Sequence, residues 1–308
     1  MPRRFHRSKP IPSPTVIDPL PPGTQPITRL GPSAVTYHIP ISPPSSTLSP
    51  SKTTIALPRY SKWTSGLHFH TQHTEYLHLI RGSIFVYLDG QTKILSAASG
   101  GEVAVYGNYK TESGLIIQIP KYARHNWGRA REYLAHHRPS CVTPRFPADI
   151  DDEVVVEEWT DPADGGKALF FWNLNGVIQA PSNTILPPLQ QFARWMLGRW
   201  WVEFQLWNLF WELDNWPVVL GLRNMLGVEW YGWPLPEGVY LRVRHMWSEV
   251  LWVGRWKKKV EGWMEWIVIL VLLGLARGIG WVVDIRAVEK ERTPAALWEE
   301  YQRKGFRG

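Results

Sequence analysis

Two histidines and a glutamate stand close together in the sequence, at a spacing that suits a metal ion. His68 and His70 are two residues apart, and Glu75 follows after a short interval. Residues two apart on a β-strand point to the same side of a sheet, and a glutamate on the next strand can face the same space. His125 can supply a fourth ligand. Imidazole and carboxylate together suit one divalent transition metal, which can be Fe, Mn, Cu, Ni or Zn.

The elements that must position these residues look like short strands. Over residues 59–178, short β-rich runs are separated by turn signals, among them Arg81-Gly82 and Asp89-Gly90. Strands of this length and spacing predict an antiparallel sandwich or barrel. The expected strands are 67–70, 75–80, 83–88, 92–95, 114–119 and 169–172.

The stretch 66–128 resembles the cupins, small jelly-roll barrels that bind a metal at their centre. The first cupin motif, G-x5-H-x-H-x3–4-E-x6-G, is matched by His68, His70, Glu75 and Gly82, with Lys62 in place of its opening glycine. The second motif, G-x5-P-x-G-x2-H-x3-N, is matched by Gly114, Pro120 and His125, with Tyr122 and Arg129 in place of its second glycine and its asparagine. The chain also looks, more loosely, like the cupin-domain proteins of fungal small-molecule pathways. The resemblance implies a mainly β fold, a cupin barrel over residues 55–178, with all four metal-binding positions kept.

Such a centre leaves one or two coordination positions open for dioxygen, water or substrate. With Fe, Mn or Cu, we expect an oxidoreductase of dioxygenase type, acting in secondary metabolism. With Zn or Ni, a non-redox isomerase or cyclase is the alternative. A non-catalytic, membrane-associated cupin that binds a small molecule is a third reading.

The lumen is expected to be apolar, which favours a small lipophilic substrate. Glu75 can act as a general base as well as a ligand, and Tyr122 can hydrogen-bond substrate at the rim. His73 is expected to be solvated in a turn, and His78 to face away from the metal. The predicted pocket residues are Leu77, Leu79, Tyr87 and Trp127.

The rest of the chain divides by composition. Residues 1–54 are rich in proline and predict an extended or disordered arm. Residues 179–188 are predicted to form a linker. Residues 189–308 predict a helical region with 15 of the chain's 19 tryptophans, a continuous helix over 189–213 and a last helix after Thr293-Pro294.

Residues 266–283 are apolar enough to be a candidate membrane segment, although Arg277 interrupts them. Because indole favours the lipid–water boundary, the tryptophans favour membrane anchoring over a soluble helical cover or a self-association surface.

The remaining composition excludes several classes. Cys141 is the single cysteine, so an intramolecular disulfide is excluded. The net charge of +7 is carried by scattered residues, which disfavours nucleic acid as a partner. No nucleotide-binding motif is present. We expect no secretory signal, an intracellular and membrane-associated location, and a homodimer as one option.

Overall fold

The computed structural model describes residues 13, 15, 17–45, 50–105, 114–136, 146–181, 184–218 and 254–305. Cys141, residues 1–12 and the tryptophan-rich stretch 219–253 lie outside the described residues.

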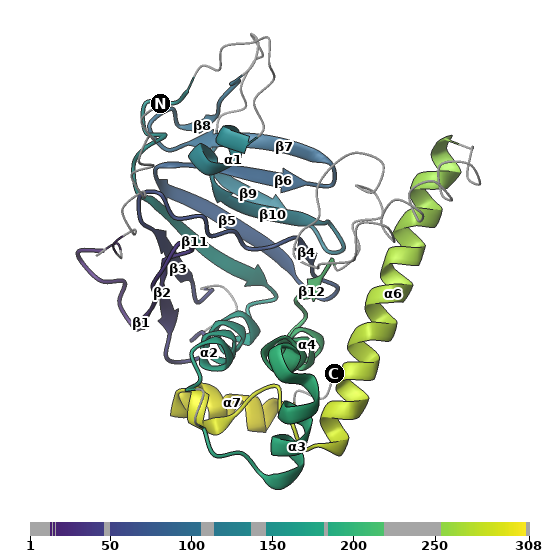
Figure 1. The fold of residues 1–308 in the computed structure, drawn as a ribbon. Helices are drawn as coiled ribbons and strands as arrows, with labels where there is room; N and C mark the ends of the chain where they lie inside the picture. Colours follow the sequence, from purple (N-terminus) through teal and green to yellow (C-terminus); the bar gives the residue numbers. More distant parts are fainter. Residues whose placement is uncertain are drawn as a thin grey trace, which may run out of the picture.

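Two six-stranded antiparallel sheets form the body of the molecule (Figure 1). In order across the first sheet lie β1 (Thr24–Arg29), β2 (Val35–Pro40), β3 (Thr53–Leu57), β11 (Val154–Asp161), β5 (Thr74–Arg81) and β9 (Ile116–Ile119). The second contains β12 (Trp216–Pro217), β4 (His68–Phe69), β10 (His125–Arg129), β6 (Ser83–Leu88), β7 (Gln91–Ser96) and β8 (Gly101–Glu102).

The predicted strands from 67 to 119 form, and their alternating side chains set the inner face. Along β5, Glu75, Leu77 and Leu79 are buried while their neighbours are partly exposed, as expected for a strand with one face on a core. The Asp89-Gly90 turn joins β6 and β7 with both residues at positive φ, as a two-residue hairpin requires.

Gly82 marks the passage from the first sheet to the second rather than a hairpin. Its φ is +76°, and a Cβ there would collide with the carbonyl oxygen of Glu153. The motif glycine is therefore required because the chain between β5 and β6 passes close to the backbone at the start of β11.

The expectation of a loose arm over residues 1–54 is wrong for residues 24–40 and 53–54. β1, β2 and the start of β3 belong to the first sheet, and all six residues of β2 are buried. The prolines are tolerated because most of them fall between strands or at the edge strand β1, where a missing amide donor costs little.

Helices cover one end of the barrel. The described helices are α1 (Ala130–His136), α2 (Gly166–Ile178), α3 (Pro188–Leu197), α4 (Trp201–Glu212), α6 (Gly254–Val282) and α7 (Ala295–Lys304), with 3-10 turns at Gly198–Trp200 and Lys290–Arg292.

Two predicted elements differ from these helices. The strand expected over 169–172 lies inside α2, because a short apolar run does not distinguish a strand from a buried helix. The single helix expected over 189–213 is broken at Gly198, which has a φ of +52°. The helix expected after Thr293-Pro294 is confirmed as α7.

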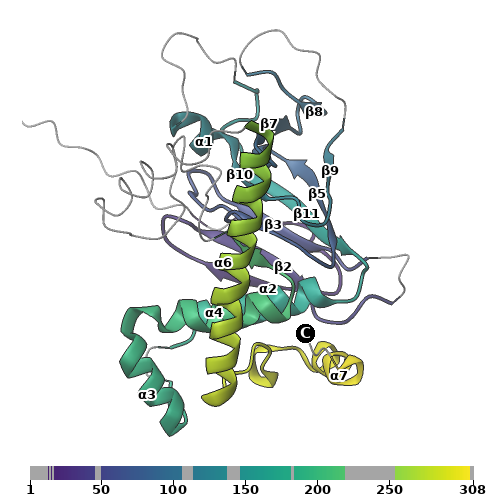
Figure 2. The same ribbon diagram turned by 90° about the vertical axis from the view of Figure 1, so that its right-hand side faces the viewer.

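α6 runs beside the barrel and past α4 (Figures 1 and 2). Within the described residues, one stretch is long and apolar enough to cross a membrane: Trp263–Val282, with a mean hydropathy of 1.8 and 28% of it buried. By itself such a helix is weak evidence for insertion. One face of α6 packs on the protein through Ile269 and Leu273 and through the ion pairs Arg124–Glu265 and Arg277–Glu212, each 2.9 Å long.

Candidate metal centre

The four predicted ligands converge inside the barrel. One ligand atom from each of His68, His70, Glu75 and His125 lies within 4.8 Å of the other three, and all four residues are buried. His68 on β4 pairs directly with His125 on β10, and His70 follows two residues later on the same face. Glu75 reaches the centre from β5 in the opposite sheet. The barrel thus brings together ligands from both of its walls.

Each of the three imidazole rings is held by a backbone carbonyl at its Nδ1 atom. The Nδ1 atoms of His68, His70 and His125 hydrogen-bond to the backbone carbonyls of Gly66 (2.8 Å), Asp214 and Ala123 (3.0 Å). A carbonyl oxygen only accepts, so each Nδ1 must carry the proton, which leaves each Nε2 of a neutral ring as a lone-pair donor. This arrangement is the usual support for a histidine that ligates a metal.

The lone pairs of the histidine Nε2 atoms therefore face those of the Glu75 carboxylate at the centre. Nε2 of His70 lies 2.6 Å from Glu75 Oε2, and Nε2 of His125 lies 3.6 Å from Glu75 Oε1. Among the described residues, the buried Nε2 of His125 and Oε1 of Glu75 have no hydrogen-bond partner. Because unpartnered buried polar atoms are costly, a shared cation is the simplest way to satisfy them. The residues present fit a divalent transition metal.

The protonation states agree with this interpretation. Burial, and then repulsion from His125, lower the pKa of His68, and burial also lowers that of His70. Burial opposes the ionisation of Glu75, yet the Lys167 ammonium and the neighbouring histidines hold the pKa of its carboxyl well below the ordinary value. Neutral imidazoles and an ionised carboxylate are the forms that bind metals.

Both motifs noted in the sequence now lie on strands of a two-sheet antiparallel barrel, with their ligands at its centre. The chain has a cupin fold.

Comparison with solved structures returns proteins of low sequence identity and low TM-score. A cupin-like protein of Thermotoga maritima is 15% identical, with a TM-score of 0.25, over 42% of this chain and 68% of that one. A protein of the same organism described as a predicted oxalate decarboxylase is 12% identical, with a TM-score of 0.27, over 44% and 91%. A putative sugar phosphate isomerase of Acidithiobacillus ferrooxidans is 11% identical, with a TM-score of 0.21, over 36% of this chain, which spans only 48% of that protein. At such scores these likenesses carry no argument about function. No family model and no curated protein matches the sequence.

A buried lysine, which the sequence did not reveal, joins the cluster. Lys167, at the start of α2, donates to Glu75 Oε2 over 2.7 Å and forms a second, very short ion pair with Glu158 on β11. Burial opposes its charge, but the two carboxylates raise the pKa of Lys167. Burial and the charge of Glu75 raise the pKa of Glu158 to about 7. Glu75 is thus held as a ligand, and Glu158 is the better candidate for proton transfer near neutral pH.

His73 is buried, so the expectation that it is solvated is wrong. Its ring lies between Asp214 (2.8 Å) and Asp164 (3.1 Å). Burial lowers its pKa, but the hydrogen bonds to the two carboxylates outweigh this and raise the pKa of His73 to about 9. The Asp214 carboxylate also accepts from the backbone amides of Thr71 (2.7 Å) and Gln72 (2.8 Å). It therefore fixes the turn that joins His70 to Glu75.

The predicted pocket residues lie in two hydrophobic clusters. Leu77, Leu79 and Trp127 are buried in the main core together with Tyr37 and Trp63, and Tyr87 packs against a smaller cluster that includes Ile269 and Leu273 of α6. Tyr122 has a φ of +65°, which fits its place at a motif glycine, but its side chain is 61% exposed. His78 does face away from the ligands and contacts Glu157 at 3.3 Å.

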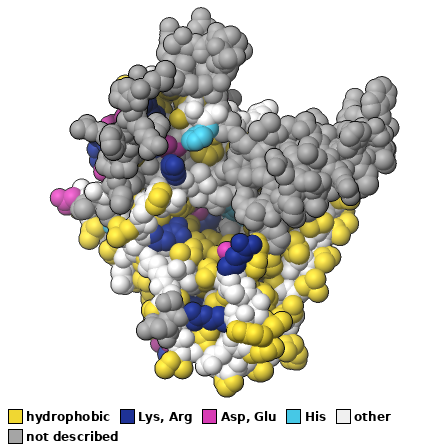
Figure 3. Space-filling view, viewed as in Figure 1, with side chains coloured by type: hydrophobic (Ala, Val, Ile, Leu, Met, Phe, Trp, Pro, Cys, Tyr) yellow, Lys and Arg dark blue, Asp and Glu magenta, His cyan; other side chains and the backbone are white. Residues whose placement is uncertain are grey.

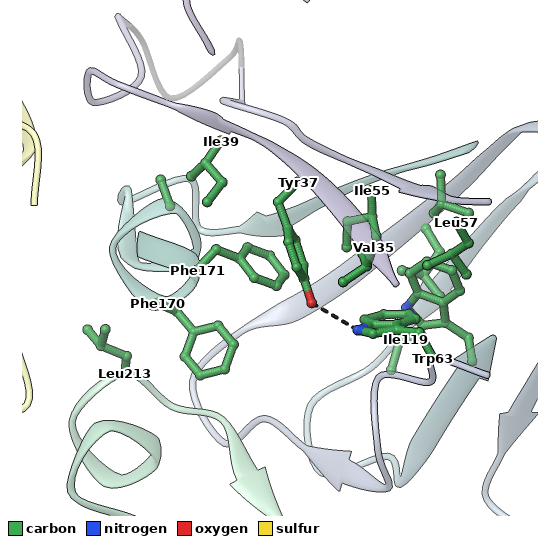
Figure 4. Close-up of a cluster of buried hydrophobic side chains, with 14 of the residues drawn as sticks. Val35, Tyr37, Ile39, Ile55, Leu57, Trp63, Ile119, Phe170, Phe171 and Leu213 are labelled. Atoms are coloured by element: carbon green, nitrogen blue, oxygen red, sulfur yellow. Dashed lines mark hydrogen bonds between the residues drawn. The ribbon is translucent and has the colours of Figure 1, made fainter. Parts of the chain in front are cut away.

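A cavity of about 180 Å³ adjoins the centre and is lined by residues that the sequence did not single out. His68 and Lys167 reach it from the ligand cluster, and Tyr37, Trp63, Phe170 and Phe171 form aromatic walls. Figure 4 shows the Tyr37 ring between Phe170 and Phe171 on one side and Trp63 on the other. The face in Figure 3 is hollowed near its centre, with hydrophobic side chains around the hollow and Lys or Arg side chains beside it.

Proposed function

We propose that the protein is a metal-dependent cupin enzyme, an oxidoreductase of dioxygenase type that acts on a small lipophilic metabolite. The observation that carries the proposal is the set of buried Nε2 and carboxylate lone pairs that face one another beside an aromatic cavity. Acceptor atoms in that arrangement need a cation between them.

Each part of the site has a role in this proposal. A bound Fe, Mn or Cu ion would supply redox chemistry with dioxygen. His68, His70, Glu75 and His125 would hold the ion, and the backbone carbonyls behind the rings would keep the rings aligned. The Lys167 ammonium keeps Glu75 ionised and oriented. The aromatic walls exclude water and hold an apolar body.

An isomerase or cyclase on the same barrel is the second candidate, because Glu158 lines the cavity and has a pKa of about 7. Such a group can take up or release a proton at neutral pH without any redox change. A third candidate, a binding protein without turnover, would use the same cavity.

Oxygen consumption separates these candidates. Protein loaded with Fe, Mn, Cu or Zn is mixed with a panel of phenols, aryl ketones, aromatic acids and terpenoids, and products are analysed by mass spectrometry. The proposal predicts oxygen uptake and an oxidised product with a redox-active ion, and neither with Zn or with the variant His70→Ala. A product of unchanged mass without oxygen uptake would favour the isomerase, and binding without any product would favour the binding protein.

We propose a membrane surface as a second partner. Ile267, Val271, Leu275 and Ile279 recur every four residues on the outer face of α6, and each is about half exposed (49%, 51%, 59% and 52%). On α3, Phe192 and Trp195 are also exposed. Because the opposite face of α6 is ion-paired to the barrel and α4, we infer that the helix lies in the interface rather than across the bilayer.

Vesicle flotation tests this placement. Wild-type protein should float with phosphatidylcholine–phosphatidylserine vesicles, and the triple change of Ile267, Val271 and Leu275 to Ser should abolish flotation. The matched control changes the exposed Ile80 and Ile116 of the barrel to Ser. Wild-type protein that stays with the soluble fraction, or a control that loses flotation equally, would contradict the proposal. A loss of dimer mass in the triple variant without lipid binding would assign the face to self-association.

A further inference from the structure

One positive charge at the cavity forms no ion pair with a described carboxylate, although Glu158 lines the same cavity. Arg29, the last residue of β1, lines the cavity that His68 also lines. Its Nη2 donates to the Tyr37 hydroxyl over 2.5 Å, and its buried Nε has no hydrogen-bond partner in the part of the chain that the structure describes. Among the described residues no Asp or Glu forms an ion pair with Arg29, whereas Lys167 is balanced by two carboxylates. Arginine presents a planar fork that suits a carboxylate.

The Tyr37 hydroxyl provides a second donor at the same place. It accepts hydrogen bonds from Arg29 and from Nε1 of Trp63, at 3.0 Å (Figure 4). Both bonds arrive at the oxygen, so neither uses the hydroxyl hydrogen, which can be donated to a ligand. Burial raises the pKa of Tyr37 to about 12, so the hydroxyl stays protonated. Arg29 and Tyr37 together can thus hold one anionic group.

Arg29 also lies on the side from which a ligand would arrive. A second depression of about 690 Å³ shares Arg29, Trp63 and Thr64 with the inner cavity and also contains Lys62, but not His68. The two hollows therefore adjoin at Arg29, and the described lining of the outer one carries basic side chains without acidic ones. Such a lining attracts anions.

The size of the inner cavity limits what can follow the anionic group. An apolar cavity of about 150 Å³ holds a benzene ring, and this one measures about 180 Å³. One ring with a short side chain fits between the aromatic walls. Tyr37 and Phe171, whose ring centroids are 5.2 Å apart, form part of those walls.

We infer that the substrate is a small aromatic or similarly flat carboxylic acid, whose carboxylate is bound by Arg29 and Tyr37 while its apolar body extends toward His68. This inference rests on the proposed function for the reaction, but the binding step does not require turnover. It narrows the lipophilic metabolite to one that carries an anionic end.

Calorimetry on metal-loaded protein tests the inference with 3-phenylpropionate and with 3-phenylpropionamide, a neutral molecule of nearly the same shape. We expect the acid to bind the wild type at least tenfold more tightly than the amide does. The variant Arg29→Met, which keeps an apolar stem, should lose that preference, and Tyr37→Phe should weaken acid binding several-fold. The control Arg59→Met, at an exposed ion pair with Asp152, should leave acid binding unchanged.

Equal binding of acid and amide to the wild type would overturn the inference. Acid binding that is unchanged in Arg29→Met, or no measurable binding of the acid at millimolar concentration, would overturn it as well. Metal content is measured separately on the same samples. Acid binding through Arg29 in protein that retains no metal would overturn the proposed function and leave this inference standing. Metal-dependent turnover that does not require Arg29 would overturn this inference and leave the proposed function standing.

Discussion

At the scale of single residues, the backbone carbonyls behind the three imidazoles decide what the cluster can do. Each carbonyl holds a proton on Nδ1, so Nε2 of every ring is a lone-pair donor, and those of His70 and His125 lie next to the Glu75 carboxylate. The spacing of the four residues could be read from the sequence because His68, His70 and Glu75 are close along the chain. Their support could not, since Lys167 and Asp214 are 92 and 143 residues away from the groups they contact.

Removing one ligand should abolish metal retention. His125→Ala removes one of the four ligands. We expect no metal to remain bound after gel filtration, as measured by elemental analysis. The barrel should stay folded, because its hydrophobic core does not include this ring. The control His78→Ala removes a histidine that faces away from the centre. Retention of a full equivalent by His125→Ala would refute the assigned ligand set.

The charge of Asp214 should strengthen metal binding indirectly. Asp214→Asn keeps a residue that tolerates the φ of +50° but weakens the hydrogen bonds that fix the turn after His70. Loss of such a supporting group typically weakens metal affinity about 10–100-fold. Competition with a zinc-binding dye measures the affinity. Asp284→Asn is the control, because Asp284 also has a positive φ (55°) and its side chain is 74% exposed. Equal affinities in both variants would contradict the positioning role.

Lys167→Met should destabilise the metal-free protein. The change leaves Glu75 and Glu158 buried without their cation, and an uncompensated buried charge typically costs about 3–5 kcal/mol. One equivalent of zinc should recover part of the loss. Urea unfolding with and without zinc measures both effects. The control Lys93→Met, at a partly exposed pair with Glu102, should change stability by less than about 1 kcal/mol. An unchanged unfolding free energy for Lys167→Met would count against the network.

At the scale of elements, the sequence predicts those strands and turns that are determined by local patterns. The alternation of β5 and the Asp89-Gly90 turn were readable because a period of two and a two-residue loop are local signals. The strand over Val35 to Pro40 was missed although its residues alternate between apolar and polar, because the many prolines around it favoured an extended arm. The run 169–172 is equally apolar whether it forms a strand or part of α2.

Substitution of two isoleucines, one inside β2 and one just beyond it, tests whether β2 is a core strand. Ile39 is fully buried, whereas Ile41, just beyond the strand, is 40% exposed. Ile39→Ala should cost about 2–5 kcal/mol of unfolding free energy, and Ile41→Ala should stay below about 1 kcal/mol. Denaturant unfolding followed by circular dichroism gives both values. Equal effects of the two changes would mean that β2 does not pack in the core as described.

At the scale of the whole molecule, the tryptophan-rich region is not a separate appendage. β12 pairs with β4, and Asp214, between α4 and β12, fixes the turn that carries two of the ligands. α6 packs on the same side of the barrel through Ile269 and Leu273. The division predicted at residues 179–188 from composition stays a prediction. The return of the chain to the barrel could not be predicted, because contacts between distant segments leave no local signal.

X-ray absorption spectroscopy of the zinc-loaded wild-type protein tests the central claim most directly, because it reports the ligands of the ion itself. One zinc per chain should show three imidazole nitrogens and at least one carboxylate oxygen, at about 2.0–2.2 Å. A spectrum without imidazole scattering, or protein that retains no metal after loading, would contradict the account.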